Sequence, residues 1–249
     1  MFSQIVMELK TDEKLTYKKA STLQGVLFEN IDTEYASLMH QQDRHPYSQY
    51  LLSENDKEYW VVNTLTEEAY ENIIKRLEDR NFNGFRIKKG DIDVSIANKR
   101  ITIVEKQTLI NELNTKDAER VFNLSFLTPM AFKQRGVYVS FPDLRLIYQS
   151  IMNKYSSISE NMVMMDEETL NQLVENSMIT KFNIRSAVFP LEGVNITGAI
   201  GNIKLYIKGS DVLARYIRLL LKFSEFSGIG VKAGIGMGAV KIREGVIEK

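Results

Sequence analysis

Residues 180–226 read TKFNIRSAVFPLEGVNITGAIGNIKLYIKGSDVLARYIRLLLKFSEF, and this stretch decides how the second half of the chain folds. Residues 180–189 and 194–208 are rich in β-branched and aromatic side chains, which is typical of strands. Ser210 and Asp211 then form a helix N-cap signal, and apolar residues recur at helical spacing up to Phe226. The stretch therefore predicts two consecutive strands followed by one long amphipathic helix.

The flanking segments complete an order of elements. Upstream, residues 120–128 and 130–139 are strand-like and carry a turn signal at Arg135-Gly136. Helix signals follow at Asp143 and Asp166, and residues 239–247 form a last strand-like segment. The order β-α-β-β-α-β predicts a ferredoxin-like unit in the second half.

The first half shows the same order with a different sequence. A helical pattern begins at about Tyr17, Asn55-Asp56 is a turn signal, and Thr66 is an N-cap signal for a second helix. The strand-like segments are residues 2–9, 47–52, 59–65, 84–89 and 91–105. The fold class is therefore predicted as α+β, with tandem ferredoxin-like domains at residues 1–115 and 116–249.

Composition limits the classes of protein that this chain can be. Among its 249 residues there is no cysteine, which excludes disulfides, thiolate metal sites and a cysteine nucleophile. The N-terminus lacks a basic signal-peptide region, and no apolar window has the length of a membrane span. We therefore expect a cytoplasmic protein without membrane association.

The net charge of zero hides an asymmetry between the two halves. Residues 1–119 carry 16 basic and 21 acidic residues, whereas residues 120–249 carry 16 and 11. A polyanionic partner would be attracted to the C-terminal half, although an offset of this size also arises by chance.

A glycine cluster lies between the long helix and the last strand. It contains Gly228, Gly230, Gly234, Gly236 and Gly238. Residues 228–233 fit a dinucleotide-binding fingerprint, but that fingerprint needs a strand before it and a helix after it. Two interpretations remain: a connection that uses glycine for positive φ, or a bare backbone that phosphates approach, with Lys232 as its charge. Alternating apolar residues indicate an ordered loop in either case.

Both histidines of the chain, His40 and His45, lie in LMHQQDRHPY, in a polar segment expected after the first helix. A zinc site would need Asp43 or other carboxylates and lacks the usual third His or Cys. Acid–base chemistry is the better use, because imidazole titrates near neutral pH. RNA supplies its own nucleophile, since a base-activated 2′-hydroxyl attacks the adjacent phosphate without a metal or a covalent enzyme intermediate.

Other potential sites are weaker. No G-x-S-x-G motif is present, and clustered acids such as Asp91 with Asp93 are simply explained as one face of a strand. Arg215, Arg218 and Lys222 share one face of the long helix. Most stripes of this kind are solvated surface, but this one leads to the glycine cluster and so is also a candidate for phosphate contacts.

With these features in place, the chain resembles the CRISPR-associated endoribonucleases that cut repeat RNA, which belong to the RAMP superfamily of paired ferredoxin-like domains. The likeness spans essentially the whole chain and is most specific in the glycine cluster. The other matching segments are LQGVLF at 23–28, LMH at 38–40, FLTPM at 126–130 and LKFSEFSG at 221–228. Within the family it most resembles the type III-A subset.

The resemblance implies metal-independent cleavage that leaves a 2′,3′-cyclic phosphate and a 5′-hydroxyl, with no cofactor. It places His40 at the position of the principal acid–base histidine. Relatives often carry a tyrosine in the first helix, where this chain has Phe28, and a lysine after the histidine, where it offers Arg44 or His45. The candidates for the partner of His40 are therefore His45 and then Tyr47.

The resemblance also implies the molecular partners. The glycine cluster and Lys232 would face CRISPR repeat RNA, with Lys133 and Arg135 as further RNA contacts. A transient association with a type III effector complex is expected. DNA is not expected as a partner. The alternatives are a RAMP protein that only holds repeat RNA within an effector complex, and a metal-dependent nuclease.

Overall fold

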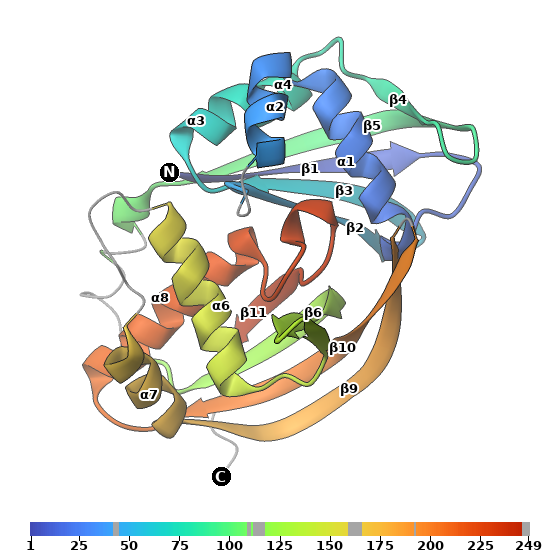
Figure 1. Ribbon diagram of the computed structural model, residues 1–249. Coiled ribbons are helices and arrows are strands. Elements are labelled where there is room, and N and C mark those ends of the chain that lie inside the picture. The colour runs from blue at the N-terminus through green and yellow to red at the C-terminus, as the bar shows by residue number, and fades with distance from the viewer. Residues whose placement is uncertain (42–44, 109–110, 112–117, 159–165, 192, 246–249) are drawn as a thin grey trace.

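The computed structural model describes residues 1–41, 45–108, 111, 118–158, 166–191 and 193–245, without the side chains of His40 and Gln41. The expected domain boundary at 115/116 lies outside the described residues. Two α+β units follow each other along the chain, as predicted, and each has one main antiparallel sheet with helices on one face (Figure 1).

The first unit is built on a five-stranded antiparallel sheet in the order β2-β3-β1-β5-β4. Its strands are β1 (Phe2–Lys10), β2 (Tyr47–Glu54), β3 (Lys57–Thr64), β4 (Gly84–Ile87) and β5 (Ile92–Val104). Its helices are α1 (Ala20–Asn30), α2 (Thr33–Gln41), α3 (Glu67–Ala69) and α4 (Lys75–Glu78), with a π-helical turn over Tyr70–Ile74. The strands β5, β1, β3 and β2 form the ferredoxin-like core of the sheet, and β4 adds one edge.

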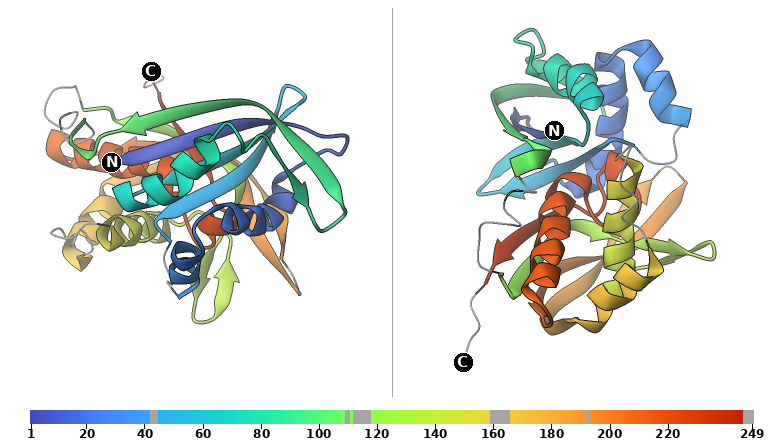
Figure 2. Two further views of the ribbon diagram at one scale, coloured as in Figure 1. Left: turned by 90° about the horizontal axis from the view of Figure 1, so that it is seen from above. Right: turned by 90° about the vertical axis from the view of Figure 1, so that its left-hand side faces the viewer.

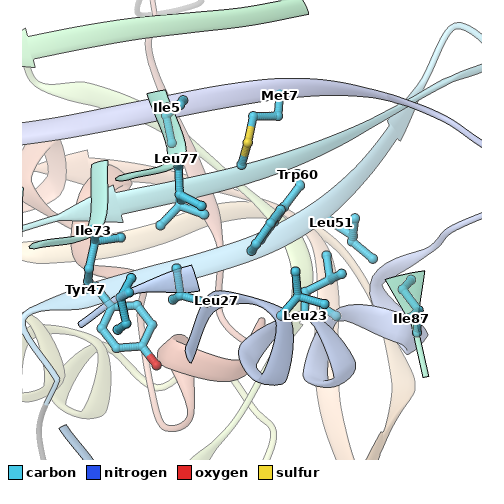
Figure 3. Packing of buried hydrophobic residues seen from close by; sticks show 14 of the residues in the cluster. Ile5, Met7, Leu23, Leu27, Tyr47, Leu51, Trp60, Ile73, Leu77 and Ile87 are labelled. Atoms are coloured by element: carbon cyan, nitrogen blue, oxygen red, sulfur yellow. The ribbon is translucent and has the colours of Figure 1, made fainter. Parts of the chain in front are cut away.

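Local signals explain several of these elements. Asn55 and Asp56 both have positive φ and make the tight turn of the β2–β3 hairpin. The hydroxyl of Thr66 accepts a hydrogen bond from the Ala69 amide at 3.1 Å and so caps the next helix. Trp60 packs among the apolar side chains of α1 and the sheet in the core of this unit (Figure 3).

One expectation was wrong in this unit. The polar segment expected to carry His40 does not begin directly after the first helix: a further helix, α2, spans Thr33–Gln41, and His40 lies in its last turn. Asp32 starts this helix, because its carboxylate accepts hydrogen bonds from the amides of Glu34 and Tyr35. Tyr35 and Met39 then recur at helical spacing and are both buried. The polar residues between them concealed this short apolar face.

The second unit has a four-stranded antiparallel sheet in the order β11-β6-β10-β9, the ferredoxin-like arrangement. Its strands are β6 (Val121–Met130), β9 (Ser177–Leu191), β10 (Val194–Ile207) and β11 (Val240–Glu244). Its helices are α6 (Leu144–Ser157), α7 (Glu167–Glu175) and α8 (Asp211–Ser227). A separate hairpin, β7 (Phe132–Gln134) with β8 (Val137–Val139), turns at Arg135-Gly136 as predicted.

The helix N-caps of the second unit agree with the sequence. Asp143, Asp166 and Ser210 accept hydrogen bonds from the amides of Leu146, Thr169 and Leu213, respectively.

The basic residues of α8, Arg215, Arg218 and Lys222, do not form the fully solvated face that was expected. Arg218 is only 7% exposed, and its Nε donates to Glu244 at 2.7 Å, because β11 packs beside the helix there.

Each unit contributes side chains to the hydrophobic core of the other. Phe189 and Ile196, at the far end of the β9–β10 hairpin, are fully buried in the first core, and Phe189 stacks on Tyr17. In return, Phe2 lies in the second core with its ring 5.3 Å from that of Phe223. In the right-hand view of Figure 2, β2 and β3 lie between the helices of the first unit and α6 and α8 of the second. This exchange fixes the two units relative to each other.

Among the described residues, no helix combines the length and the apolar character needed to cross a membrane.

Candidate functional site

A cleft of about 610 Å³ opens where the two units and the glycine cluster meet. Its size falls within the range of about 300–1,000 Å³ that is typical of ligand sites. The first unit contributes residues that follow α2, and the second contributes α6, the β7–β8 hairpin and part of the glycine cluster. The lining side chains and backbone come from His45, Tyr47, Leu65, Phe132, Lys133, Gln134, Tyr138, Leu146, Gln149, Ser150, Asn153, Lys154, Ser157, Ser227, Gly230, Val231, Lys232, Ala233, Gly234 and Ile235.

His45 and Tyr47, two of the predicted catalytic residues, lie side by side in this cleft. Their rings stack with centroids 5.4 Å apart. The Tyr47 hydroxyl accepts a hydrogen bond of 3.0 Å from the Gln24 side-chain amide. Burial raises the pKa of Tyr47 far above its ordinary value, so its phenol keeps its proton at neutral pH. Tyr47 is therefore suited to donate a hydrogen bond or a proton, not to accept one as a base.

The remaining residues of this region differ in how far the structure describes them. His40 lies on α2, but its side chain is outside the described part, and so is all of Arg44. Phe28 projects from α1 toward Tyr47, with ring centroids 6.2 Å apart in an edge-on arrangement. The position expected to hold a tyrosine in relatives therefore carries an apolar ring that packs against Tyr47 here.

The glycine cluster, residues 228–238, is an ordered segment packed into the protein. Ile229 and Met237 are buried, as the alternating pattern predicted. A side chain at Gly230 would overlap the Ala131 carbonyl oxygen, and one at Gly238 would overlap the Ile229 carbonyl oxygen; both residues have positive φ. Glycine is required at these two positions by close backbone approach within the protein.

The five glycines do not contribute equally to the cleft. All five are buried, and only Gly230 and Gly234 line the cleft. At Gly234 a Cβ would lie 3.0 Å from Cδ2 of His45 and 3.4 Å from the Tyr47 hydroxyl oxygen. The backbone at Gly234 therefore forms the surface against which His45 and Tyr47 pack.

Buried polar contacts that the sequence did not predict hold the glycine cluster in place. The Gln49 side-chain amide donates to the carbonyl oxygens of Gly234 at 3.2 Å and Ala20 at 3.4 Å. Its side-chain oxygen accepts a hydrogen bond of 2.6 Å from Trp60. Gln49 is fully buried in β2, so a glutamine within an otherwise strand-like run was the available signal.

The second unit also holds the glycine cluster by hydrogen bonds. Ser150 accepts a hydrogen bond of 2.8 Å from the Gly230 amide. The Lys154 ammonium donates to the carbonyl oxygens of Ser227 and Gly228, both at 3.0 Å, at the C-terminus of α8. Helix α6 and strand β2 thus clamp the cluster between them.

The cleft is electropositive. Lys133, Lys154 and Lys232 line it, and no aspartate or glutamate is among the lining residues. Arg135 is exposed at the β7–β8 turn but does not line the cleft. In the described part of the chain, no group of three His, Asp or Glu side chains is placed to hold a metal ion. Imidazole, a neutral phenol, ammonium groups and backbone amides suit acid–base chemistry on a bound phosphate.

Comparison with known proteins gives consistent results. A family model described as "CRISPR-associated endoribonuclease Cas6" matches residues 124–240. A CRISPR-associated endoribonuclease Cas6 of Streptococcus thermophilus is 30% identical over 97% of this chain and 98% of its own length. One from Mycobacterium tuberculosis strain H37Rv is 32% identical over 97% of this chain and 78% of its own length. A solved Cas6 product complex superposes with a TM-score of 0.80 at 19% identity and covers 98% of this chain and 99% of the solved one.

Proposed function

The chain belongs to the Cas6 family of CRISPR-associated endoribonucleases, and from this we propose that its interdomain cleft cleaves CRISPR repeat RNA by attack of the RNA's own 2′-hydroxyl. The protein is an endoribonuclease of CRISPR RNA maturation. We assign the reaction to this cleft because His45, Tyr47 and the glycine cluster lie together there in one electropositive site.

The proposed reaction needs one proton acceptor and one proton donor. A base accepts the proton of the 2′-hydroxyl, whose oxygen attacks the adjacent phosphorus and forms a P–O bond. The bond from phosphorus to the 5′-oxygen of the next nucleotide breaks, and an acid protonates that oxygen. The products are a 2′,3′-cyclic phosphate and a 5′-hydroxyl, and no metal or cofactor takes part in these steps.

We assign the principal acid–base role to His40, and its partner to His45 or, second, to Tyr47. Among the described residues that line the cleft, His45 carries the only side chain that ordinarily changes charge near neutral pH. Tyr47 is held in the neutral form by burial, so its role would be that of a proton or hydrogen-bond donor to the leaving oxygen. His40 stands five residues before His45 in the sequence, which supports its assignment to the same site.

The RNA contacts extend from the cleft. Lys232 and Lys133 supply charge for phosphates within it, and Arg135 reaches beyond it on the β7–β8 hairpin. The glycine cluster offers backbone approach at Gly230 and Gly234, whereas Gly228, Gly236 and Gly238 are buried and do not line the cleft. One solved relative is a Cas6 product complex, which supports repeat RNA as the partner. A cytoplasmic location and transient association with a type III effector complex complete the proposal.

A cleavage assay distinguishes this function from a protein that only holds repeat RNA. Wild-type protein should cut labelled repeat RNA in EDTA and leave a cyclic phosphate, whereas RNA with a 2′-deoxy nucleotide at the scissile position should stay intact. His40→Ala should lower the single-turnover rate by about 10²–10⁴-fold with RNA binding retained, because one positioned acid–base group contributes that much.

Three results would contradict the proposal. Binding without cleavage would favour the purely RNA-holding protein, and loss of cleavage in EDTA would favour a metal-dependent nuclease. Wild-type cleavage rates in His40→Ala would exclude His40 as the acid–base residue.

A further inference from the structure

Helix α6 faces the cleft with two different rows of polar side chains. Ser150 and Lys154 form the first row, four residues apart, and both bind the glycine cluster by the hydrogen bonds described above. This row fastens the helix to the backbone that packs against His45 and Tyr47. The rotation of α6 about its axis is thereby fixed relative to the candidate catalytic residues.

The second row lies beside the first and is turned into the cleft. Gln149, Asn153 and Ser157 are spaced four residues apart on α6, and all three line the cleft. Gln149 and Asn153 are half-buried, so both residues form part of its wall and remain partly exposed. Tyr138 of the β7–β8 hairpin lines the same cleft with a partly buried aromatic ring.

These side chains differ in chemistry from the groups that suit phosphates. A side-chain amide carries a donor and an acceptor next to each other, the pattern with which proteins pair to the edge of a base. Phosphate binding is served by the lysines of the cleft and by backbone amides. An aromatic ring such as Tyr138 offers a face on which an unpaired base stacks.

Resting on the proposed function, we propose that Gln149 and Asn153 read the edge of a base next to the scissile phosphate, with Tyr138 as its stacking partner. They are then specificity-determining residues of the cleavage reaction. The same cleft that holds His45 and Tyr47 would accept one nucleotide better than others, because only a base with the complementary donor and acceptor matches both groups of a side-chain amide.

The test measures base preference and not overall rate. Repeat RNAs carrying each of the four bases at the two positions flanking the scissile bond are cleaved under single-turnover conditions by wild type, Gln149→Met and Asn153→Leu. Both substitutions keep the approximate shape and remove the hydrogen-bonding groups. We expect the ratio of rates for the preferred and the poorest base to fall by about 5- to 150-fold, the range for loss of one bidentate base contact.

Two further variants distinguish base recognition from a structural effect of the substitutions on the base ratio. Gln172→Met removes an exposed glutamine on α7, outside the cleft, and should leave the ratio unchanged. Gln149→Glu keeps an acceptor but loses the donor, so it should change which base is preferred. Thermal unfolding of each variant confirms that it is folded.

The results separate this inference from the function on which it rests. If wild type cleaves but the base ratio is the same in Gln149→Met and Asn153→Leu, the inference is wrong and the proposed function stands. Equal loss of rate on all bases would also overturn it and make the row a structural support. If wild type cuts none of the RNAs, the function and the inference fall together.

Discussion

Replacing Gly234 by alanine tests whether the glycine cluster positions His45 for catalysis. The backbone of Gly234 does not have positive φ, so alanine is conformationally acceptable and the steric contact acts alone. The new Cβ would lie 3.0 Å from Cδ2 of His45, whereas ordinary contacts begin near 3.4 Å. The imidazole must therefore move by about 0.4 Å.

The expected cost follows from that displacement. A shift of 1 Å at a reacting centre costs up to about 10²-fold in rate, so about 0.4 Å should slow cleavage by roughly 5- to 10-fold. Gly234→Val adds a branch toward Tyr47, which lies 3.4 Å from the same Cβ position, and should slow cleavage further. The assay is single-turnover cleavage of labelled repeat RNA at saturating protein, with binding measured separately.

Gly25→Ala is the matched control. Gly25 is exposed on α1 and nothing lies within 4 Å of its Cβ position. This substitution should leave the cleavage rate unchanged and raise the free energy of unfolding by about 0.5–1 kcal/mol, because alanine favours a helix over glycine. Wild-type rates in both Gly234→Ala and Gly234→Val would refute the reasoning and remove His45 and Tyr47 from the reacting centre.

Three more predictions concern binding, packing and pH. Lys232→Ala should weaken RNA affinity and reduce the slope of log affinity against log salt by about 0.7–0.9, one phosphate contact, in a salt titration; an unchanged slope would place the RNA elsewhere. Gln49→Leu should lower the free energy of unfolding by about 1–3 kcal/mol, because the buried Trp60 N–H loses its acceptor. Trp60 is the only tryptophan of the chain, so its fluorescence should shift as well; a wild-type Tm and emission would contradict that bond. Because burial raises the pKa of Tyr47 in the folded state, its contribution to stability is complete below about pH 10 and is lost above it, by about 1.4 kcal/mol per pH unit. Wild type should therefore lose more Tm than Tyr47→Phe between pH 10 and 11, and equal losses would argue against a buried phenol.

The sequence predicted local structure well where the signal was local. Thr66, Asp143 and Ser210 each accept the predicted capping hydrogen bond, and Asn55-Asp56 makes the predicted turn. The helix over Thr33–Gln41 was missed because its buried face is short and interrupted by polar residues. The burial of Arg218 was missed because its cause, packing of β11 beside α8, is not a property of either segment alone.

By itself, the sequence determined the β-α-β-β-α-β core order of both units, the glycine cluster, and the candidates His45 and Tyr47 within one short segment. Only the tertiary structure brought residues 45–47, α6 and the glycine cluster into one cleft, and only there do Gln49 and Lys154 acquire a role. The physical reason is the distance along the chain over which each kind of interaction acts. Capping, turns and hydrophobic periodicity act over a few residues, whereas the cleft arises from core side chains exchanged between units far apart in the chain.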